Sequence, residues 1–341
     1  MMGEFENPFI SVCIANFNGM GVIDDCLRSV QKQIGNLSIE IIVHDDASTD
    51  GSAEYIRLHY PDVVLLESAE NVGFCVSNNR MVDRARSKYI LLLNNDAALF
   101  PDALTTLKME AERIGRPAML GLPQYDADTG ELADIGSLLD PFLNSVPNLD
   151  SERGDVGMVA GACLWMPKTL WLELGGFPEW FGSIGEDLYL CCRARLAGYQ
   201  VRALGNSGFR HHIGHSFGGG KVKRGQLSST LMRRAMSERN KTFVMIVSYP
   251  DPALQIMLPL HLALLMAEGL AISLAKRSLV PWRSIYAPLL PDLWHNKKRI
   301  LDLRRQIQST RHISSGQWFS AFLIWPYKLR MLLKYGLPEL R

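Results

Sequence analysis

The sequence lacks the cysteine spacing of a zinc site or a disulfide framework. No C-x-x-C pair occurs among its six cysteines, and most of them lie within apolar runs. They are Cys13, Cys26, Cys75, Cys163, Cys191 and Cys192. Cysteines in this setting are typical of buried free thiols in a reducing compartment.

Glycine motifs that bind phosphates are also missing. No segment at the end of an expected strand matches G-x-G-x-x-G or G-x-x-x-x-G-K-[ST]. This absence argues against a Rossmann dinucleotide site and against a P-loop. The loop after the first expected strand, residues 16–19, has one glycine and no lysine, which argues against nucleotidyl transfer.

The N-terminus shows no basic stretch leading into an apolar one, so we expect no signal peptide. Hydrophobic residues make up 47% of the 341 residues and charged residues 21%, which excludes wholesale disorder and permits a sizeable core. The length allows two domains, or one domain with a long appendage.

The net charge of +1 conceals two halves of opposite sign. From Lys221 onward the chain has 20 Lys and Arg against 6 Asp and Glu, whereas the first 220 residues have 16 against 29. An acidic front part and a basic tail indicate that the tail meets an anionic surface, either a membrane or a nucleic acid.

Short apolar runs alternate with helical patterns over roughly the first 120 residues. Strands are expected at residues 9–15, 39–43, 63–66 and 89–93, with helix-compatible segments between them. This alternation predicts an α/β fold built on a doubly wound, mainly parallel sheet. Further strands are expected at 159–166 and 201–204, and a helix at 227–247. Residues 123–156 are expected to form a long loop or a small excursion over the site.

Acidic and amide side chains follow two of these strands. Asp45 and Asp46 come directly after the second, and Asn94, Asn95 and Asp96 after the fourth. Because parallel strands place their carboxyl ends at one edge of a sheet, these side chains should share that edge. Their oxygens suit a divalent cation and the phosphates that it carries, although Asn and Asp are also ordinary turn residues.

Two later segments add candidate groups. Glu186 and Asp187 open an expected helix after Gly185, where they could simply complement the helix dipole or serve as a general base. Three histidines, His211, His212 and His215, fall within five residues, which favours one of them as a metal ligand.

Several motifs together resemble those of the inverting family-2 glycosyltransferases with a GT-A fold. They are SVCIANFNG (11–19), HDDASTDGS (44–52), ENVGF (70–74), LLNNDA (92–97), GGF (175–177), GED (185–187), RARLAGY (193–199), HHIGHS (211–216) and ERN (238–240). Their order is similar to that in bacterial rhamnosyltransferases and related surface-polysaccharide enzymes. The resemblance covers roughly residues 9–250.

The resemblance implies a role for each matching residue. On the donor side, Ala15, Asn16 and Phe17 would border the nucleotide base, Asp45 or Asp46 would contact the base or ribose, and Arg239 would approach the diphosphate. Asn94, Asn95 and Asp96 stand at the metal-binding element, so Asp96 and His211 (or His212) would hold Mn²⁺ or Mg²⁺. Asp187 would be the general base and Glu186 its support.

The resemblance also implies the reaction: a sugar moves from a dTDP-, UDP- or GDP-linked donor to a hydroxyl of a glycan acceptor, which would be lipid-linked. The domain would comprise residues 1–250, with a nucleotide-binding half at 9–120 and an acceptor and catalytic half at 121–250. Asn95 replaces the usual Pro of the metal element, and Tyr189 replaces an Asp common two residues after the base. Because of the difference at Tyr189, the resemblance does not indicate which sugar is transferred or which acceptor is used.

Residues 251–341 form the expected helical tail. Between Asp251 and Lys276 the only formally charged residue is Glu268, so this stretch could lie in a membrane interface, span a bilayer or form a buried helix. Basic residues then interleave with apolar ones from 293 to 307, which fits either membrane-surface binding or a charged helix packed on the domain. We therefore expect an enzyme at the cytoplasmic face of a membrane.

Two other functional classes remain as alternatives. One is a catalytically inactive protein that binds nucleotide-sugars. The other is a nucleic-acid-binding protein that uses the basic tail, which is disfavoured because the aromatic residues of the tail lie in apolar runs instead of alternating with basic ones.

Overall fold

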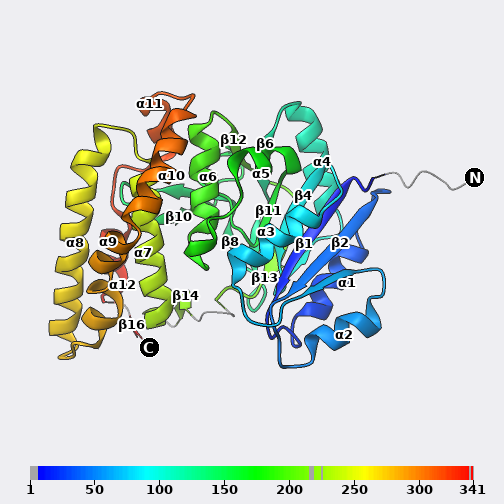
Figure 1. Cartoon of the computed structure of the whole chain (residues 1–341), viewed down its shortest axis with the longest axis horizontal. Coiled ribbons are helices and arrows are strands. Elements are labelled where there is room, and N and C mark those ends of the chain that lie inside the picture. Colours follow the sequence, from blue (N-terminus) through cyan, green and yellow to red (C-terminus); the bar gives the residue numbers. More distant parts are fainter. Residues whose placement is uncertain (1–6, 215–218, 224–225, 338, 341) are drawn as a thin grey trace, which may run out of the picture.

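The computed structural model of the chain describes residues 7–214, 219–223, 226–337 and 339–340, and the side chains of residues 215–227 lie outside the description. A seven-stranded sheet forms its centre, in the order β12-β6-β11-β4-β1-β2-β3 (Figure 1). The strands are β1 (Ile10–Asn16), β2 (Ile39–Asp45), β3 (Val64–Glu67), β4 (Tyr89–Asn94), β6 (Ala118–Gly121), β11 (Cys163–Pro167) and β12 (Gln200–Ala203). All neighbouring strands are parallel except β11, which is antiparallel to β4 and β6.

The apolar run of β4 explains why both faces of the sheet are covered. Successive side chains of a strand point to opposite faces. Ile90 and Leu92 therefore join one buried cluster, whereas Leu91 and Leu93 join the other.

Helices cover both clusters. The first is covered by α3 (Phe74–Arg84), α5 (Lys168–Leu174), α6 (Glu186–Leu196) and α7 (Leu231–Ser248). The second is covered by α1 (Ile23–Gln31), α2 (Ser52–His59) and α4 (Ala103–Ile114). The predicted fold class, a mainly parallel sheet with helices on both faces, is confirmed.

A smaller four-stranded sheet, in the order β5-β13-β7-β8, lies beside the carboxyl end of β4. Its strands are β5 (Ala97–Leu99), β13 (Phe209–His211), β7 (Gln124–Asp126) and β8 (Leu132–Asp134). The prediction of a loop over residues 123–156 was wrong, because this segment also contains the pair β9 (Ser137–Leu139) and β10 (Ser145–Pro147). Strands of three residues are too short to show an alternating pattern.

The expected helix start at Leu227 was also wrong. Residues 226–229 form β15 (Gln226–Ser229), which pairs with β14 (Gly219–Lys223) and with β16 (Glu339–Leu340) near the C-terminus. The helix begins at Leu231, after Thr230 caps the backbone N–H of Arg233. A pairing partner more than 100 residues away in sequence is not visible in a local pattern.

The tail is helical, as predicted. It contains α8 (Ala253–Ala275), η2 (Trp282–Tyr286), α9 (Leu289–His295), α10 (Lys297–Ser309), α11 (Ser315–Trp318), η3 (Phe319–Ala321) and α12 (Tyr327–Tyr335). Among the described residues, α8 is the one helix long and apolar enough to cross a membrane. It forms the edge of the molecule farthest from β2 (Figure 1).

The basic amphipathic stretch packs on the domain. Ile300 and Ile307 of α10 are buried. The Arg304 guanidinium donates to the backbone carbonyls of Ile246 (2.6 Å) and Tyr249 (2.8 Å) at the end of α7. The apolar side of α10 is thus occupied by protein, which is the second of the two interpretations left open for this stretch.

Candidate active site

Asn16 joins the ends of three strands at the carboxyl edge of the sheet. Its side chain is fully buried, and Nδ2 donates to Asp45 Oδ1 (2.8 Å) and to Ser52 Oγ (2.9 Å). Its Oδ1 accepts a hydrogen bond from Asn95 Nδ2 (2.9 Å). A Cβ atom at Gly19 would collide with both Asn16 Oδ1 and Asn95 Nδ2, so the Asn16–Asn95 contact requires glycine there.

The two acidic side chains after β2 are engaged within the chain. Asp45 also accepts from Ser48, through its backbone N–H (2.9 Å) and its hydroxyl (2.7 Å). Asp46 accepts from the backbone N–H groups of Val72 (2.7 Å) and Gly73 (2.9 Å), which fixes the loop before α3. Both carboxylates are almost completely buried. Their contact with base or ribose stays a prediction. Their observed hydrogen bonds fix the loops at the carboxyl edge of the sheet.

The other donor-side candidates differ in access. Ala15 is half-buried, whereas Phe17, the first residue after β1, is 51% exposed. An exposed aromatic ring at the edge of a sheet is free to stack on a planar base.

Pairing of β13 with β5 brings Asp96 and His211 together. His211 lies opposite Ala97, and the backbone N–H of His212 donates to the carbonyl of Asp96 (3.1 Å). As a result, His211 Nε2 lies 3.1 Å from Asp96 Oδ1 and 3.4 Å from Asn94 Nδ2. His212 instead turns toward Asp128, with its Nδ1 3.1 Å from the carboxylate. The structure therefore places His211, and not His212, beside Asp96.

The donor atoms around Asp96 fit a divalent cation. Within the part of the chain that is described, Asn94 Oδ1 is buried without a hydrogen-bond partner, and Asp96 Oδ1 has only the ion-pair contact with His211 Nε2. A carboxylate and an imidazole suit Mn²⁺, which usually completes its shell with water or phosphate oxygens. The same described residues contain no group of three or more His, Cys, Asp or Glu arranged around a metal position, so such an ion would need further ligands from a bound diphosphate or water.

Glu186 and Asp187 begin α6 after a turn that needs glycine. Gly185 has a φ of +92°, a left-handed conformation that residues with a Cβ rarely adopt. Asp187 Oδ2 accepts from the backbone N–H of Gly161 (3.1 Å). The next residue, Ala162, accepts from the backbone N–H of Asn94 (3.1 Å). This link sets the start of α6 beside the carboxyl end of β4, as a shared site requires.

Burial changes the proton affinity of the two carboxyl groups. It raises the pKa of Glu186 to about 8, with the nearby charge of Asp187 as the second cause. Burial also raises the pKa of Asp187, against hydrogen bonds from the Gly161 and Leu188 backbone N–H groups that lower it. Among the described residues, Glu186 Oε2 has no hydrogen-bond partner. Two such neighbours hold a proton more readily than isolated carboxyl groups, which suits acid–base work near neutral pH.

Arg233 is a site residue that the sequence did not reveal. Its positive charge favours the ionised forms of both Glu186 and Asp187, and burial lowers its own pKa. It lies one turn before Met236 and two turns before Asn240 on α7, and both of those side chains approach the loop that precedes α6. Residues spaced by three or four along a helix share a face, which is the signal that could have identified Arg233.

Asn240 holds that loop in place. Its Nδ2 lies within hydrogen-bonding distance of the carbonyls of Phe181 (3.1 Å), Ser183 (3.0 Å) and Ile184 (2.7 Å). The Arg239 guanidinium also donates to the Phe181 carbonyl (3.0 Å) and to Asn240 Oδ1 (3.0 Å). The predicted approach of Arg239 to the diphosphate stays a prediction, since its observed partners are in the loop, whose first residues form η1 (Glu179–Phe181).

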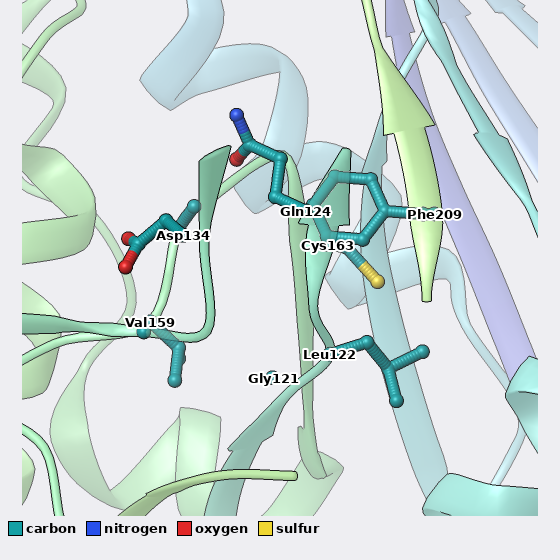
Figure 2. Close-up of a pocket in the computed structure, with 9 residues that line it drawn as sticks. Gly121, Leu122, Gln124, Asp134, Val159, Cys163 and Phe209 are labelled. Carbon is teal, nitrogen blue, oxygen red and sulfur yellow. The ribbon is translucent and has the colours of Figure 1, made fainter. Parts of the chain in front are cut away.

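Two hollows lie away from these groups. Figure 2 shows the first, which is lined by Gly121, Leu122, Val159, Cys163 and Phe209, with Gln124 and Asp134 at its side. Its volume is about 10 Å³, enough for one water molecule and too small for a sugar. The second, of about 640 Å³, opens between Phe9, Ser38, Arg86 and Lys88, at the amino ends of the strands. Neither includes the carboxylates described above.

Comparison with known proteins shows which proteins the chain resembles. The family model Glycosyl transferase family 2 matches residues 11–169. An N-acetylglucosaminyl-diphospho-decaprenol L-rhamnosyltransferase of Mycobacterium tuberculosis is 24% identical over 210 residues, which cover 53% of this chain and 68% of the relative.

Solved structures show the same fold. TarS 1–349 of S. aureus in complex with UDP-GlcNAc matches with a TM-score of 0.57 and 14% identity, over 89% of this chain and 91% of the other. The mannosyltransferase PcManGT of Pyrobaculum calidifontis, in complex with GDP-Man and Mn²⁺, matches with a TM-score of 0.51 and 18% identity, over 93% and 86%. Residues 11–169 thus match the model of family-2 glycosyltransferases, and the chain has the α/β fold of these solved structures.

Proposed function

We propose that the chain is a metal-dependent inverting glycosyltransferase that uses a nucleotide-sugar donor and a glycan acceptor. The observation that carries the proposal is the link through Gly161 and Ala162, which sets the buried carboxylates of α6 beside the end of β4 with Asn94 and Asp96. A base and a diphosphate site are the two parts that this reaction needs at one place.

Asp187 is the proposed general base. In an inverting transfer, the acceptor oxygen attacks the anomeric carbon while the carboxylate takes the hydroxyl proton, and the bond to the departing diphosphate breaks. The raised pKa of Asp187 makes it a stronger base than a solvated aspartate, and Arg233 favours its ionised form. Glu186 supports it by sharing the proton of the pair.

The carboxyl edge of the sheet is the proposed donor site. Phe17 lies exposed at the end of β1, Asn16 ties Asp45 to Asn95, and Asp46 fixes the loop before α3. Asp96 and His211 would hold Mn²⁺ or Mg²⁺, and such an ion neutralises charge on the departing diphosphate when bound. The complexes of similar structures with UDP-GlcNAc and with GDP-Man and Mn²⁺ support this assignment.

The proposed acceptor is a lipid-linked glycan at the cytoplasmic face of a membrane, in the synthesis of a cell-surface polysaccharide. The mycobacterial relative, an N-acetylglucosaminyl-diphospho-decaprenol L-rhamnosyltransferase, supports this choice. Six buried free cysteines agree with a reducing compartment. A catalytically inactive protein that binds nucleotide-sugars is the competing function.

The experiment combines binding with turnover. The purified full chain is titrated with dTDP-, UDP- and GDP-linked sugars, with and without Mn²⁺, while thermal stability and donor hydrolysis are measured. A ligand at 100 times its dissociation constant stabilises the protein by about 2.7 kcal/mol. We expect stabilisation that depends on Mn²⁺, together with slow hydrolysis. Stabilisation without hydrolysis or transfer to any acceptor would indicate the inactive protein, and no stabilisation by any donor would contradict both functions.

A further inference from the structure

Helix α8 has two opposite faces. Towards the protein, it buries His261, Leu265, Gly269, Ile272 and Ser273, which repeat at intervals of three and four residues. This inner face packs on α7 and η2, where Leu265 and Ile272 join Ile285, Tyr286 and Leu289 in a small core.

The opposite face of α8 is apolar and exposed. Ile256, Leu260, Leu264, Leu270 and Leu274 are 67%, 45%, 48%, 52% and 77% exposed. Their spacing places them on one side of the helix, and Ala263, Ala267 and Ala271 lie exposed between them. We call these eight residues the outer face of α8. No charged residue belongs to it.

The single charged side chain of α8 belongs to the inner side. Glu268 accepts hydrogen bonds from Arg234 of α7 and from Lys328 of α12 (2.8 Å). Lys328 also pairs with Glu238 of α7 (2.6 Å), which in turn pairs with Lys241 (2.7 Å). Burying a glutamate in a membrane costs free energy, but Glu268 is not on the outer face. Contact of the outer face with lipid therefore does not carry this cost.

The same cluster argues against a spanning helix. To cross a bilayer, α8 would have to leave Arg234 and Lys328 behind or draw them into the hydrocarbon core. If α8 moved away from Arg234 and Lys328, their ion pairs with Glu268 would break. If the two basic residues moved with α8, several charged groups would enter the lipid. Both changes cost free energy. α7 cannot follow, since its Asn240 and Arg239 hold the loop before the catalytic carboxylates.

Charge on the neighbouring segments favours an anionic occupant. From Ala253 to the C-terminus the chain has 13 Lys and Arg against 4 Asp and Glu. Exposed basic residues follow α8 at Lys276 and Arg277 and occur at Lys297 and Lys298 near the exposed Trp294. An apolar strip that ends in basic residues, followed in the chain by an exposed tryptophan and further basic residues, is typical of a helix that lies in a membrane interface.

We propose that the outer face of α8 docks the enzyme on an anionic bilayer, with the helix lying in the plane of the interface. Helix α7 packs both on α8 and on α6, the helix that begins with Glu186 and Asp187. The geometry lets a lipid-linked acceptor reach the base while the nucleotide-binding end points away from the membrane. This docking rests on the proposed function, because it concerns how the enzyme meets a lipid-linked acceptor. The test measures membrane binding separately from sugar transfer.

The first arm of the test is flotation with vesicles of phosphatidylcholine alone or mixed with phosphatidylglycerol. We expect the full chain to float with the mixed vesicles, and the double variant Leu264→Glu, Leu274→Glu to bind at least about tenfold more weakly. The matched control is Leu58→Glu, which charges a comparably exposed leucine (67%) on α2, far along the chain from α8. It should float like the unaltered chain. Equal flotation of the double variant would overturn the proposal.

The second arm separates an in-plane helix from a span. Single cysteines replace Ile256, Ala267 and Leu274 and carry a fluorophore, while the six native cysteines are buried. Quenchers placed at different depths in the bilayer should report the same shallow depth for all three labels. A middle label deeper than both outer ones would show a span and overturn the in-plane geometry.

The third arm measures mass in solution. If the full chain does not float but forms a dimer that the double variant loses, the outer face binds a second copy and the proposal is wrong. Donor hydrolysis is measured on every variant without vesicles. Hydrolysis retained by a variant that has lost flotation separates failure of docking from failure of the proposed reaction.

Discussion

The two acidic residues at the end of β2 and Glu186 at the start of α6 are all buried, but their hydrogen-bonding groups are satisfied to different degrees. Asp46 receives two backbone N–H groups and Asp45 receives a serine and an asparagine. Glu186 has one carboxyl oxygen without a partner among the described residues, and the pKa of both Glu186 and Asp187 is raised. Carboxylates whose hydrogen bonds are complete build the loops of the site, whereas incompletely satisfied ones remain available to hold a proton.

The largest expected effect is at Asp187. Asp187→Asn keeps the shape of the side chain but removes the base, so we expect the transfer rate to fall by about 10²–10⁴. Donor affinity should stay within a few-fold of the unaltered value, because the proposed role of the side chain is to take a proton from the acceptor and not to bind the donor. Single-turnover rates and donor titration measure the two quantities. A variant with near-normal turnover would mean that another group takes the proton.

The metal pair should give the next largest effect. Asp96→Ala is expected to weaken Mn²⁺-dependent binding of a nucleoside diphosphate by about 10–100-fold, since a ligand of the ion is lost. His211→Ala should weaken it less, and the matched control His212→Ala should leave it nearly unchanged because His212 faces Asp128. Isothermal titration with and without Mn²⁺ provides the measurement. If His212→Ala weakened Mn²⁺-dependent binding more than His211→Ala, His212 and not His211 would be the metal ligand.

Arg233 should tune the base. Its charge favours the ionised pair, so Arg233→Met should raise the pKa of the pair and move the acidic limb of the pH–rate profile upward by about one unit. The control Arg233→Lys should retain most of the original profile. Rates measured between pH 5 and 9 compare the three proteins. An unshifted limb in the methionine variant would show that Arg233 does not act on the carboxylates.

The smallest effect concerns stability. The folded-state pKa of Glu186 is raised from 4.5 to about 8, so burial of its protonated form contributes stability below pH 4.5 that is lost as the pH rises through 8. Glu186→Gln cannot ionise. We therefore compare the melting temperature of the variant with that of the unaltered chain at each pH. The difference, variant minus unaltered chain, should increase by about 2–4 °C or more from pH 5 to pH 8.5. A constant difference across this range would show that Glu186 titrates normally.

More of the fold than of the candidate site could be predicted from the sequence. The apolar run at 89–93 and the strand–helix alternation predicted the sheet because both are local patterns. Asp96 and Asp187 were predicted from motif positions, and their roles remain predictions. The pairing of β13 with β5, which separates His211 from His212, joins segments more than 100 residues apart and leaves no local trace. Arg233 and Asn240 were missed because an ordinary helical segment gives no sign of which face meets the loop.

The tail shows the same limit. Its apolar length and charge were evident, but which residues pack on α7 was not. The stretch at 293–307 has the more amphipathic sequence, yet its apolar side is buried by protein, whereas α8 leaves a whole apolar face exposed. The position of Glu268 inside an ion cluster depends on Arg234 and Lys328, 34 and 60 residues away.

The contrast between the carboxylates that build the loops and those that hold the proton is tested most directly by comparing Asp46→Asn with Asp187→Asn in turnover and in melting temperature. Asp46→Asn weakens two buried backbone hydrogen bonds, so it should lower stability by about 1–3 kcal/mol and keep turnover per folded molecule within a few-fold. Asp187→Asn also weakens two backbone hydrogen bonds and should cost no more stability than Asp46→Asn, but it should lose at least about 10² in turnover. A stable Asp46 variant without activity, or an active but unstable Asp187 variant, would contradict the account.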